Sequence, residues 1–133
     1  MLKLEIVTPE RKVLSELVDT VILPASSGEI CILPNHAPLI STLKSGVLSY
    51  SHGNFIGKLV VSGGFVEVNN NQVSVLADAA EHDYEINLES AIAEKEELEK
   101  ALSKWTGSEE EFQEKREELD RVEARVICAS QRK

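Results

Sequence analysis

The sequence holds few of the residues that build metal sites, disulfides and nucleic-acid surfaces. It has two cysteines and three histidines in 133 residues, and 14 basic against 23 acidic side chains give a net charge of −9. Cys31 and Cys128 are far apart and have no metal-ligand spacing, so we expect free thiols in a reducing compartment and no metal. A chain with this charge lacks the positive field that binding to nucleic acid needs.

Long hydrophobic runs are also lacking. No run of 18 apolar residues occurs, and no basic leader precedes an apolar segment, so we expect neither a membrane span nor a secretory signal. The hydrophobic content of 42% is nevertheless ordinary for a globular protein and excludes wholesale disorder. The length suits one compact domain, alone or with an appendage.

Residues 1–84 alternate apolar and polar positions between closely spaced turn signals. "LKLEI" places Leu2, Leu4 and Ile6 on one face, and "HGN" and "NNNQ" fit tight hairpins. "EICILP" is a short continuous apolar run, as expected of a strand covered on both faces, and we expect Cys31 in the core. Many short antiparallel strands without helices predict an antiparallel β-sandwich or barrel, and we place a β-sandwich domain here.

Residues 85–133 change to a helical period. Apolar positions recur every three or four residues from Leu88 to Trp105, with Lys95 among them, and Asn87 precedes them as a candidate N-cap. Gly107 is placed to end this helix in a left-handed conformation. Ser108 then opens a second helix, and the short connection predicts an antiparallel two-helix hairpin in an α+β chain. Few large apolar side chains lie on its stripe, so the hairpin needs the sandwich or a partner to pack against.

The stretch "GEICILPNHAPLI" brings a thiol, an imidazole and a carboxylate within a few positions: Cys31, His36 and Glu29. A cysteine nucleophile needs a base within hydrogen-bond reach, and a proline-containing turn does not fix that relation. Pro34 and Pro38 instead favour a preshaped loop around His36 on the rim of the sandwich. An enzyme built on Cys31 and His36 stays a minor alternative, and rapid alkylation of a native thiol would indicate it.

Two other readings follow from the residues alone. One is an interaction module, and the other is a stand-alone ligand-binding or adaptor sandwich, for which no convergent polar groups are evident. Arg121 and Arg125 share one face of the second helix, and from the residues alone we expect a solvated face on which they pair with neighbouring Glu118, Asp120 and Glu123.

Two strings, "GEICILPNHAPLISTLKSGVL" and "VSGGFVEVNNNQVSVLADAAE", carry a resemblance to a known family. The chain resembles the epsilon subunit of bacterial F-type ATP synthases, whose pattern runs G-E-x-G-I-L-P-x-H-A-P-L, then G-G-F/I-x-E-V and V-L-A-D. The resemblance runs the full length, including the hairpin. Cys31 stands where the family usually has glycine.

The resemblance implies a non-catalytic rotor subunit without a cofactor. Such subunits join the gamma subunit in the central stalk, sit on the ring of c subunits and transmit rotation. They also restrain ATP hydrolysis, when the second helix inserts among the catalytic beta and alpha subunits. The complex lies at the cytoplasmic face of the cell membrane. Carried over by motif, Glu29 and His36 lie near the polar loops of the c ring, and we expect both on one contact loop at the rim of the sandwich.

Some members of this family bind ATP through a motif I/L-D-x-x-R-A, together with arginines on the second helix. Here the corresponding string is "INLESA", which keeps Ile86 and Ala91 but has Asn87 and Ser90 at the charged positions. Arg121 and Arg125 match the second-helix arginines in spacing. Since both charged anchors of the motif are absent, we expect weak or absent ATP binding.

Positive charge gathers at the end of the acidic hairpin. Against Glu123, the last residues carry four basic side chains, Arg121, Arg125, Arg132 and Lys133. In the family, the extended arm meets an acidic segment of the beta subunit, so we expect these four residues to form the inhibitory part of the arm.

Overall fold

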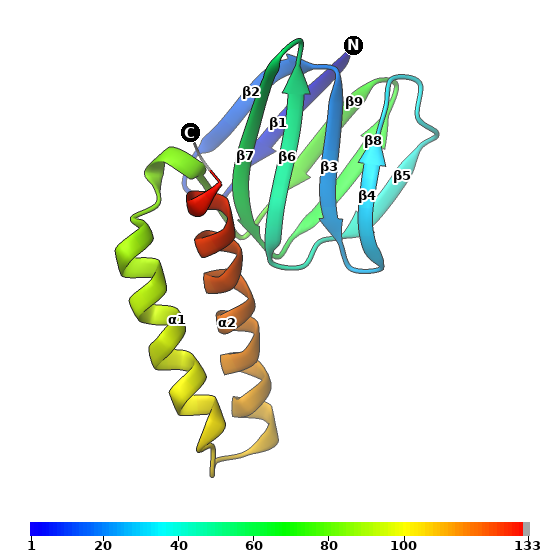
Figure 1. Ribbon diagram of the computed structural model, residues 1–133. Coiled ribbons are helices and arrows are strands. Elements are labelled where there is room, and N and C mark those ends of the chain that lie inside the picture. Colours follow the sequence, from blue (N-terminus) through cyan, green and yellow to red (C-terminus); the bar gives the residue numbers. More distant parts are fainter. Residues whose placement is uncertain (132–133) are drawn as a thin grey trace.

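A computed structural model describes residues 1–131, in which strands form a sandwich and two helices follow it (Figure 1). The strands are β1 (Leu2–Val7), β2 (Lys12–Val18), β3 (Thr20–Ala25), β4 (Gly28–Ile32), β5 (Leu39–Thr42), β6 (Gly46–His52), β7 (Phe55–Ser62), β8 (Phe65–Asn69), β9 (Gln72–Leu76) and β10 (Ala79–His82). A short 3₁₀ turn, η1 (Asp83–Glu85), leads to α1 (Leu88–Ser103) and α2 (Glu109–Ser130).

The strands form two five-stranded sheets that pack face to face. The first sheet has the order β2-β1-β9-β8-β5, and the second has the order β10-β7-β6-β3-β4. The predicted β-sandwich is therefore confirmed. One pair differs from the antiparallel expectation, because β1 and β9 run parallel, with Lys3 opposite Gln72. These two strands are joined through the rest of the sandwich and not by a hairpin, so no turn forces them to be antiparallel.

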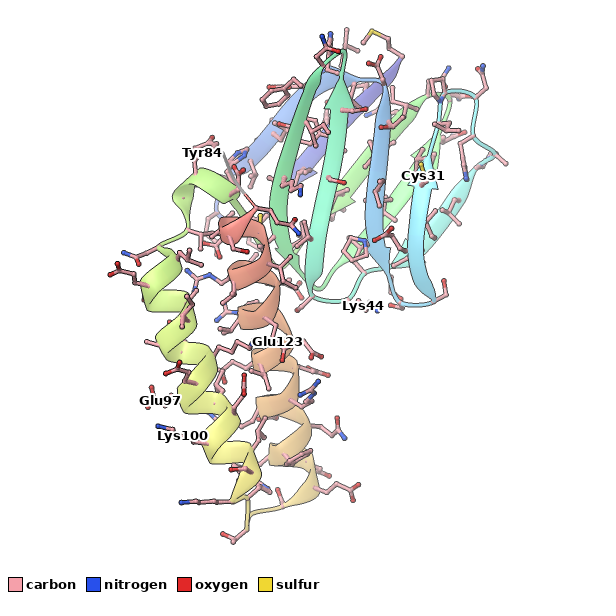
Figure 2. All side chains as sticks on the ribbon, in the orientation of Figure 1. Cys31, Lys44, Tyr84, Glu97, Lys100 and Glu123 are labelled. Atoms are coloured by element: carbon pink, nitrogen blue, oxygen red, sulfur yellow. The ribbon has the colours of Figure 1, made fainter. Side chains whose placement is uncertain are left out.

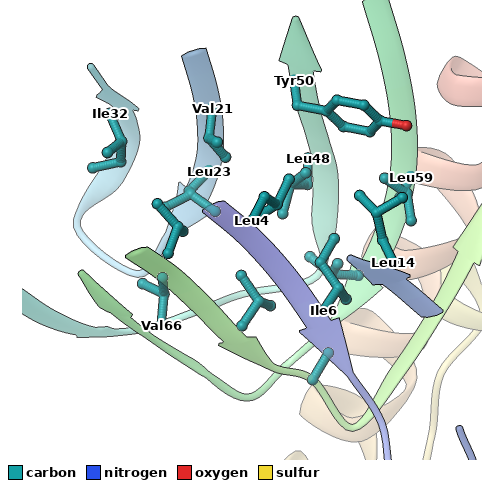
Figure 3. Close-up of a cluster of buried hydrophobic side chains, with 14 of the residues drawn as sticks. Leu4, Ile6, Leu14, Val21, Leu23, Ile32, Leu48, Tyr50, Leu59 and Val66 are labelled. Carbon is teal, nitrogen blue, oxygen red and sulfur yellow. The ribbon is translucent and has the colours of Figure 1, made fainter. Parts of the chain in front are cut away.

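The core of the sandwich is made by the inward-facing alternate positions of both sheets (Figure 3). Leu2, Leu4 and Ile6 are fully buried, as the alternation in "LKLEI" predicts. They meet residues such as Leu48 and Leu59 from the opposite sheet. Among the described residues, every member of this cluster and every side chain packed against it lies before Glu81. The sandwich thus has a core to which the helices add nothing.

The connection between β8 and β9 shows why asparagine is used in these turns. Asn70 and Asn71 have φ values of 49° and 61°, and Asn69 pairs with Gln72 across the turn. Two successive positive φ values match the twist of the flanking strands, and asparagine tolerates them better than most residues. The hairpin predicted from "NNNQ" is confirmed.

Cys31 is exposed, so its predicted place in the core is wrong. It lies on β4, an edge strand, and pairs with Ile22 of β3 on the outer face of the second sheet, away from the helices (Figure 2). Ile32, next to it, is fully buried on the inner face. The helices pack on β6 and β7 and leave β3 and β4 uncovered, so the apolar run in "EICIL" is covered on one face within this chain.

Both helices begin where the sequence predicts. The side-chain oxygen of Asn87 accepts the N–H of Ser90 at 2.9 Å, and that of Ser108 accepts the N–H of Glu111 at 3.2 Å. The predicted end of the first helix is wrong, because α1 stops at Ser103 and Gly107 is not left-handed. A Cβ on Gly107 would lie 2.8 Å from the ring of Trp105, so the glycine makes room for the indole.

The helices form an antiparallel hairpin whose base rests on the outer face of β6 and β7 (Figure 1). A small apolar cluster joins the two parts: Val60, Ile86, Ala91, Ala124, Cys128 and Ala129. The rest of the hairpin projects beyond the sandwich, with Glu97 and Lys100 on the surface of α1 (Figure 2). Among residues 1–131, neither helix has the length and apolarity needed to cross a membrane.

Candidate functional site

Glu29 and His36 lie at opposite ends of β4: Glu29 is within the strand, and His36 lies beyond its last residue. Glu29 is exposed near the start of β4, opposite Pro24, whereas His36 follows the end of β4 and is half-buried. About 10 Å of strand separates Glu29 from Ile32, at roughly 3.3 Å per residue. The prediction of one rim loop holding both side chains is therefore wrong for Glu29, which belongs to a strand.

The loop around His36 has a defined shape. The N–H of His36 donates to the carbonyl of Leu33 at 3.1 Å, and Asn35 between them has a φ of 67°. The N–H of Asn35 donates to Oδ1 of Asn71 at 2.6 Å, which ties the loop to the β8–β9 turn. Nδ1 of His36 lies 2.7 Å from the carbonyl of Ala37 and donates to it. The loop is preshaped, as the prolines indicate.

Arg125, on α2, forms ion pairs with carboxylates on two other elements. Its Nε lies 2.6 Å from Oε1 of Glu81 in β10, and its Nη1 lies 3.4 Å from Oε2 of Glu94 in α1. The sequence-based alternative, in which Arg125 pairs along its own helix, is wrong. No signal in the sequence could have selected Glu81 and Glu94, because they lie on other elements and far along the chain.

Residues at the positions of the candidate nucleotide motif have structural roles in this chain. Ile86 and Ala91 are buried in the cluster beneath the hairpin, and Asn87 caps α1 by binding the N–H of Ser90. Arg121 is half-buried and lines a cavity of about 270 Å³ with Arg125, Glu81 and residues of β7 and β10. A carboxylate therefore already stands beside the guanidinium groups in this cavity. Arg132 and Lys133 lie outside the described residues.

The linker between sandwich and helices is held by a second ionic contact. Nη2 of Arg11 donates to both carboxylate oxygens of Glu85, at 3.0 and 3.1 Å, and the N–H of His82 donates to Oε1 of Glu85 at 2.9 Å. The hydrogen bond from His82, and then Arg11, hold the pKa of Glu85 below its usual value. His82 is itself buried, with Nε2 3.1 Å from the carbonyl of Val13.

A larger cavity, of about 520 Å³, is lined by residues of β6, β7 and η1. Tyr50, Phe55 and Tyr84 contribute aromatic rings to its wall, and Lys58 and Gln131 close one side through a 2.7 Å hydrogen bond. Burial raises the pKa of Tyr50. Among the described residues, no group of three or more His, Cys, Asp or Glu side chains is placed to hold a metal ion.

Comparisons with known proteins agree on one family. The family model described as "ATP synthase, Delta/Epsilon chain, beta-sandwich domain" matches residues 1–83. The ATP synthase epsilon chain of Desulfitobacterium hafniense (strain Y51) is 48% identical over 104 residues, which are 78% of this chain and 79% of that protein. The epsilon chain of Syntrophobacter fumaroxidans is 44% identical over 128 residues, 96% of this chain and 95% of that one. The chain belongs to the ATP synthase epsilon chain family.

Membership makes it a non-catalytic subunit of the central stalk of an F-type ATP synthase. A chain in a structure of the Euglena gracilis mitochondrial ATP synthase, resolved with OSCP, F1 and the c-ring, shares the fold. Its TM-score is 0.83 at 22% identity, covering 98% of this chain and 81% of that chain. The epsilon-chain family thus accounts for both the sandwich and the hairpin.

Proposed function

We propose that this epsilon-family chain joins the gamma subunit to the ring of c subunits, and that its hairpin is an arm restraining ATP hydrolysis. The observation that carries the proposal is the two-part construction. Residues 1–84 contain a complete core, whereas the described part of the hairpin, residues 85–131, rests on it through a cluster of mostly small side chains. Such an arm can leave the sandwich without unfolding it, and rotation can be transmitted in either position of the arm.

The outer face of the first sheet supports a gamma contact. Phe65 and Leu76 lie opposite each other in β8 and β9 and are 44% and 45% exposed, and Ile40 on β5 is 74% exposed. The helices cover the other sheet, so none of the described residues 1–131 covers these three apolar side chains, of which Ile40 is paired with Glu67 and lies diagonal to Phe65 (Figure 1). Exposed apolar side chains that gather on one face of a folded domain favour a contact with another protein.

Contact with the c ring is proposed for Glu29 and His36. Both side chains are accessible: Glu29 lies on an edge strand and His36 in a loop of defined shape. Neither contributes to the core cluster. Because the two lie apart, we assign them to two separate contacts. We propose the cytoplasmic face of the cell membrane as the site of the complex, where this chain is held by its partner subunits.

The decisive experiment removes the arm. Deleting residues 84–133 should leave the sandwich folded, because its core lies entirely before Glu81, and the enzyme assembled, yet its ATPase activity should rise. Phe65→Asp should instead weaken assembly, since an apolar side chain is worth about 1.5–3 kcal/mol when buried. If the truncated chain restrains hydrolysis as fully as the intact one, the arm is not the brake.

A further inference from the structure

Arg125 connects α2 to two other elements at one point. Its guanidinium group contacts Glu81, on the edge strand of the sandwich, and Glu94, on the first helix, at 2.6 and 3.4 Å. The Arg125 side chain is 17% exposed, whereas the other arginines and lysines in described ion pairs are 37% to 50% exposed. A cation removed from water to this degree needs carboxylate partners.

The apolar part of the same interface is small. Val60 and Ile86 are its large buried side chains, the two helices contribute Ala91, Ala124, Ala129 and Cys128, and Val47, Leu88 and Val126 pack against it while partly exposed. Burial of alanine removes little apolar surface from water, so this cluster alone holds the hairpin weakly. Glu81 pairs in register with Val60, and the ionic cluster therefore borders the apolar one.

The contact between Arg125 and Glu81 depends on charge more than on a directed hydrogen bond. Nε of Arg125 is buried and close to the carboxylate, but the approach is not aligned as a hydrogen bond. Glutamine has the shape of glutamate without its charge, so it keeps the packing and loses the attraction. In a hairpin that has left the sandwich, by contrast, Arg125 has lost Glu81 and keeps only Glu94, which lies on α1 of the same hairpin.

We propose that Arg125 and Glu81 form a carboxylate–guanidinium clasp that holds the hairpin on the sandwich, with Glu94 orienting the guanidinium group from α1, so that the chain fixes the docked position with its own residues. Any effect of the clasp on ATP hydrolysis rests on the proposed function of the hairpin as an inhibitory arm. The effect of the clasp on docking does not, because it can be tested in the isolated chain.

The chain contains its own reporter of undocking. Cys128 is fully buried in the cluster between the hairpin and the sandwich, while Cys31 is exposed on β4. In a Cys31→Ser background, the rate at which Cys128 reacts with a thiol reagent such as DTNB reports how often α2 leaves the sheet. When closing is faster than reaction, this rate follows the population of the open state.

Glu81→Gln and Glu94→Gln should each raise the reaction rate of Cys128. We expect about tenfold for Glu81→Gln, which corresponds to about 1.4 kcal/mol in the docking equilibrium. The effect of Glu94→Gln should be smaller, because Glu94 and Arg125 both belong to the hairpin and undocking does not itself separate them. Glu99→Gln is the matched control: it removes one carboxylate from α1, where Glu99 pairs with Lys95 inside the helix at 3.8 Å.

A double-mutant cycle tests whether Arg125 is the residue through which Glu81 acts. In an Arg125→Met background, Glu81→Gln should no longer change the rate, since independent contributions would add. Trp105, which packs on Phe112 at the far end of the hairpin, shows by its fluorescence whether the helices stay together. The proposal is overturned if Glu81→Gln reacts like Glu99→Gln, if its effect persists without Arg125, or if the hairpin itself melts. None of these outcomes depends on whether the arm restrains hydrolysis.

Discussion

Asn87 caps α1 through its side-chain oxygen, which accepts the N–H of Ser90 at 2.9 Å. The same residue stands where ATP-binding relatives of this family are expected to have aspartate, and Ser90 stands at the arginine position. Arg125, the matched residue on α2, is already neutralised by Glu81 and Glu94. A nucleotide phosphate would have to displace both carboxylates before it met this guanidinium group.

Millimolar ATP should therefore change the melting temperature by less than about 1 °C. A bound ligand would do more, because each tenfold excess over its Kd adds about 1.4 kcal/mol of stability. Differential scanning fluorimetry of the isolated chain, with and without ATP, makes the measurement. A clear stabilisation that disappears in Arg121→Ala would show that the cavity beside Arg121 binds nucleotide in spite of the motif.

A second prediction for single residues concerns the stability and the c-ring attachment of variants at Glu29 and His36. Both are surface side chains, so Glu29→Ala and His36→Ala should each lower the stability of the sandwich by less than about 0.5 kcal/mol. Each should weaken attachment to membranes that hold the c ring, and because the two side chains lie apart, their effects should add. Denaturant unfolding and co-sedimentation of the assembled enzyme measure the two properties. Unfolding caused by either substitution would make that residue structural.

At the scale of elements, η1 is fixed by charge as well as by packing. Arg11 holds Glu85 through two hydrogen bonds, and His82 donates to the same carboxylate from the backbone. These contacts lower the pKa of Glu85 in the folded chain relative to the unfolded chain. The ionised carboxylate thus stabilises the fold above the ordinary pKa of glutamate, and this contribution is lost as the pH falls through the lowered value.

Glu85→Gln should consequently reduce stability at neutral pH and flatten the loss of stability between about pH 5 and pH 3, where glutamate ordinarily titrates. Thermal unfolding across this range gives the comparison with the unchanged chain. Glu97→Gln, an exposed carboxylate on the surface of α1 (Figure 2), is the control and should leave the pH profile in place. An unchanged profile in Glu85→Gln would assign the acid sensitivity to other groups.

Local sequence patterns predicted the secondary-structure elements better than they predicted which elements pack against one another. Alternation placed Leu2, Leu4 and Ile6 on the buried face, and the caps at Asn87 and Ser108 were found because capping is chemistry within four residues. The parallel pairing of β1 with β9 was missed, because local alternation does not specify which distant strand lies alongside.

Residues at the contacts between elements were the hardest to predict. An apolar run does not show whether its second face will be covered, and Cys31 is exposed because the hairpin packs two strands away. Glu81 and Glu94 were missed for a related reason, since only the docked hairpin brings them to Arg125. The motif strings identified the family, yet they did not indicate that Glu29 and His36 would be separated.

For the whole molecule, the balance between docked and free hairpin links the clasp to the proposed brake. Arg125 has opposite effects in the two positions. Docked, it binds the hairpin to the sandwich, whereas in a free arm it adds to the basic end that would meet the catalytic subunits. Substituting Arg125 therefore alters both states at once. Substituting Glu81, its carboxylate partner on the sandwich, alters docking and leaves the basic residues of the arm intact.

An assembled ATP synthase carrying Glu81→Gln together with Glu94→Gln should accordingly hydrolyse ATP more slowly than the unchanged enzyme. The freed arm keeps Arg121 and Arg125 and spends more time in the braking position. Raising the ionic strength should reduce the difference, because salt screens exposed charge pairs beyond about 10 Å at 0.1 M. ATPase assays over a salt series make the measurement, with Glu99→Gln as the control that leaves the clasp in place. Faster hydrolysis in the double variant would mean that the docked hairpin, and not the free arm, is the inhibitory form.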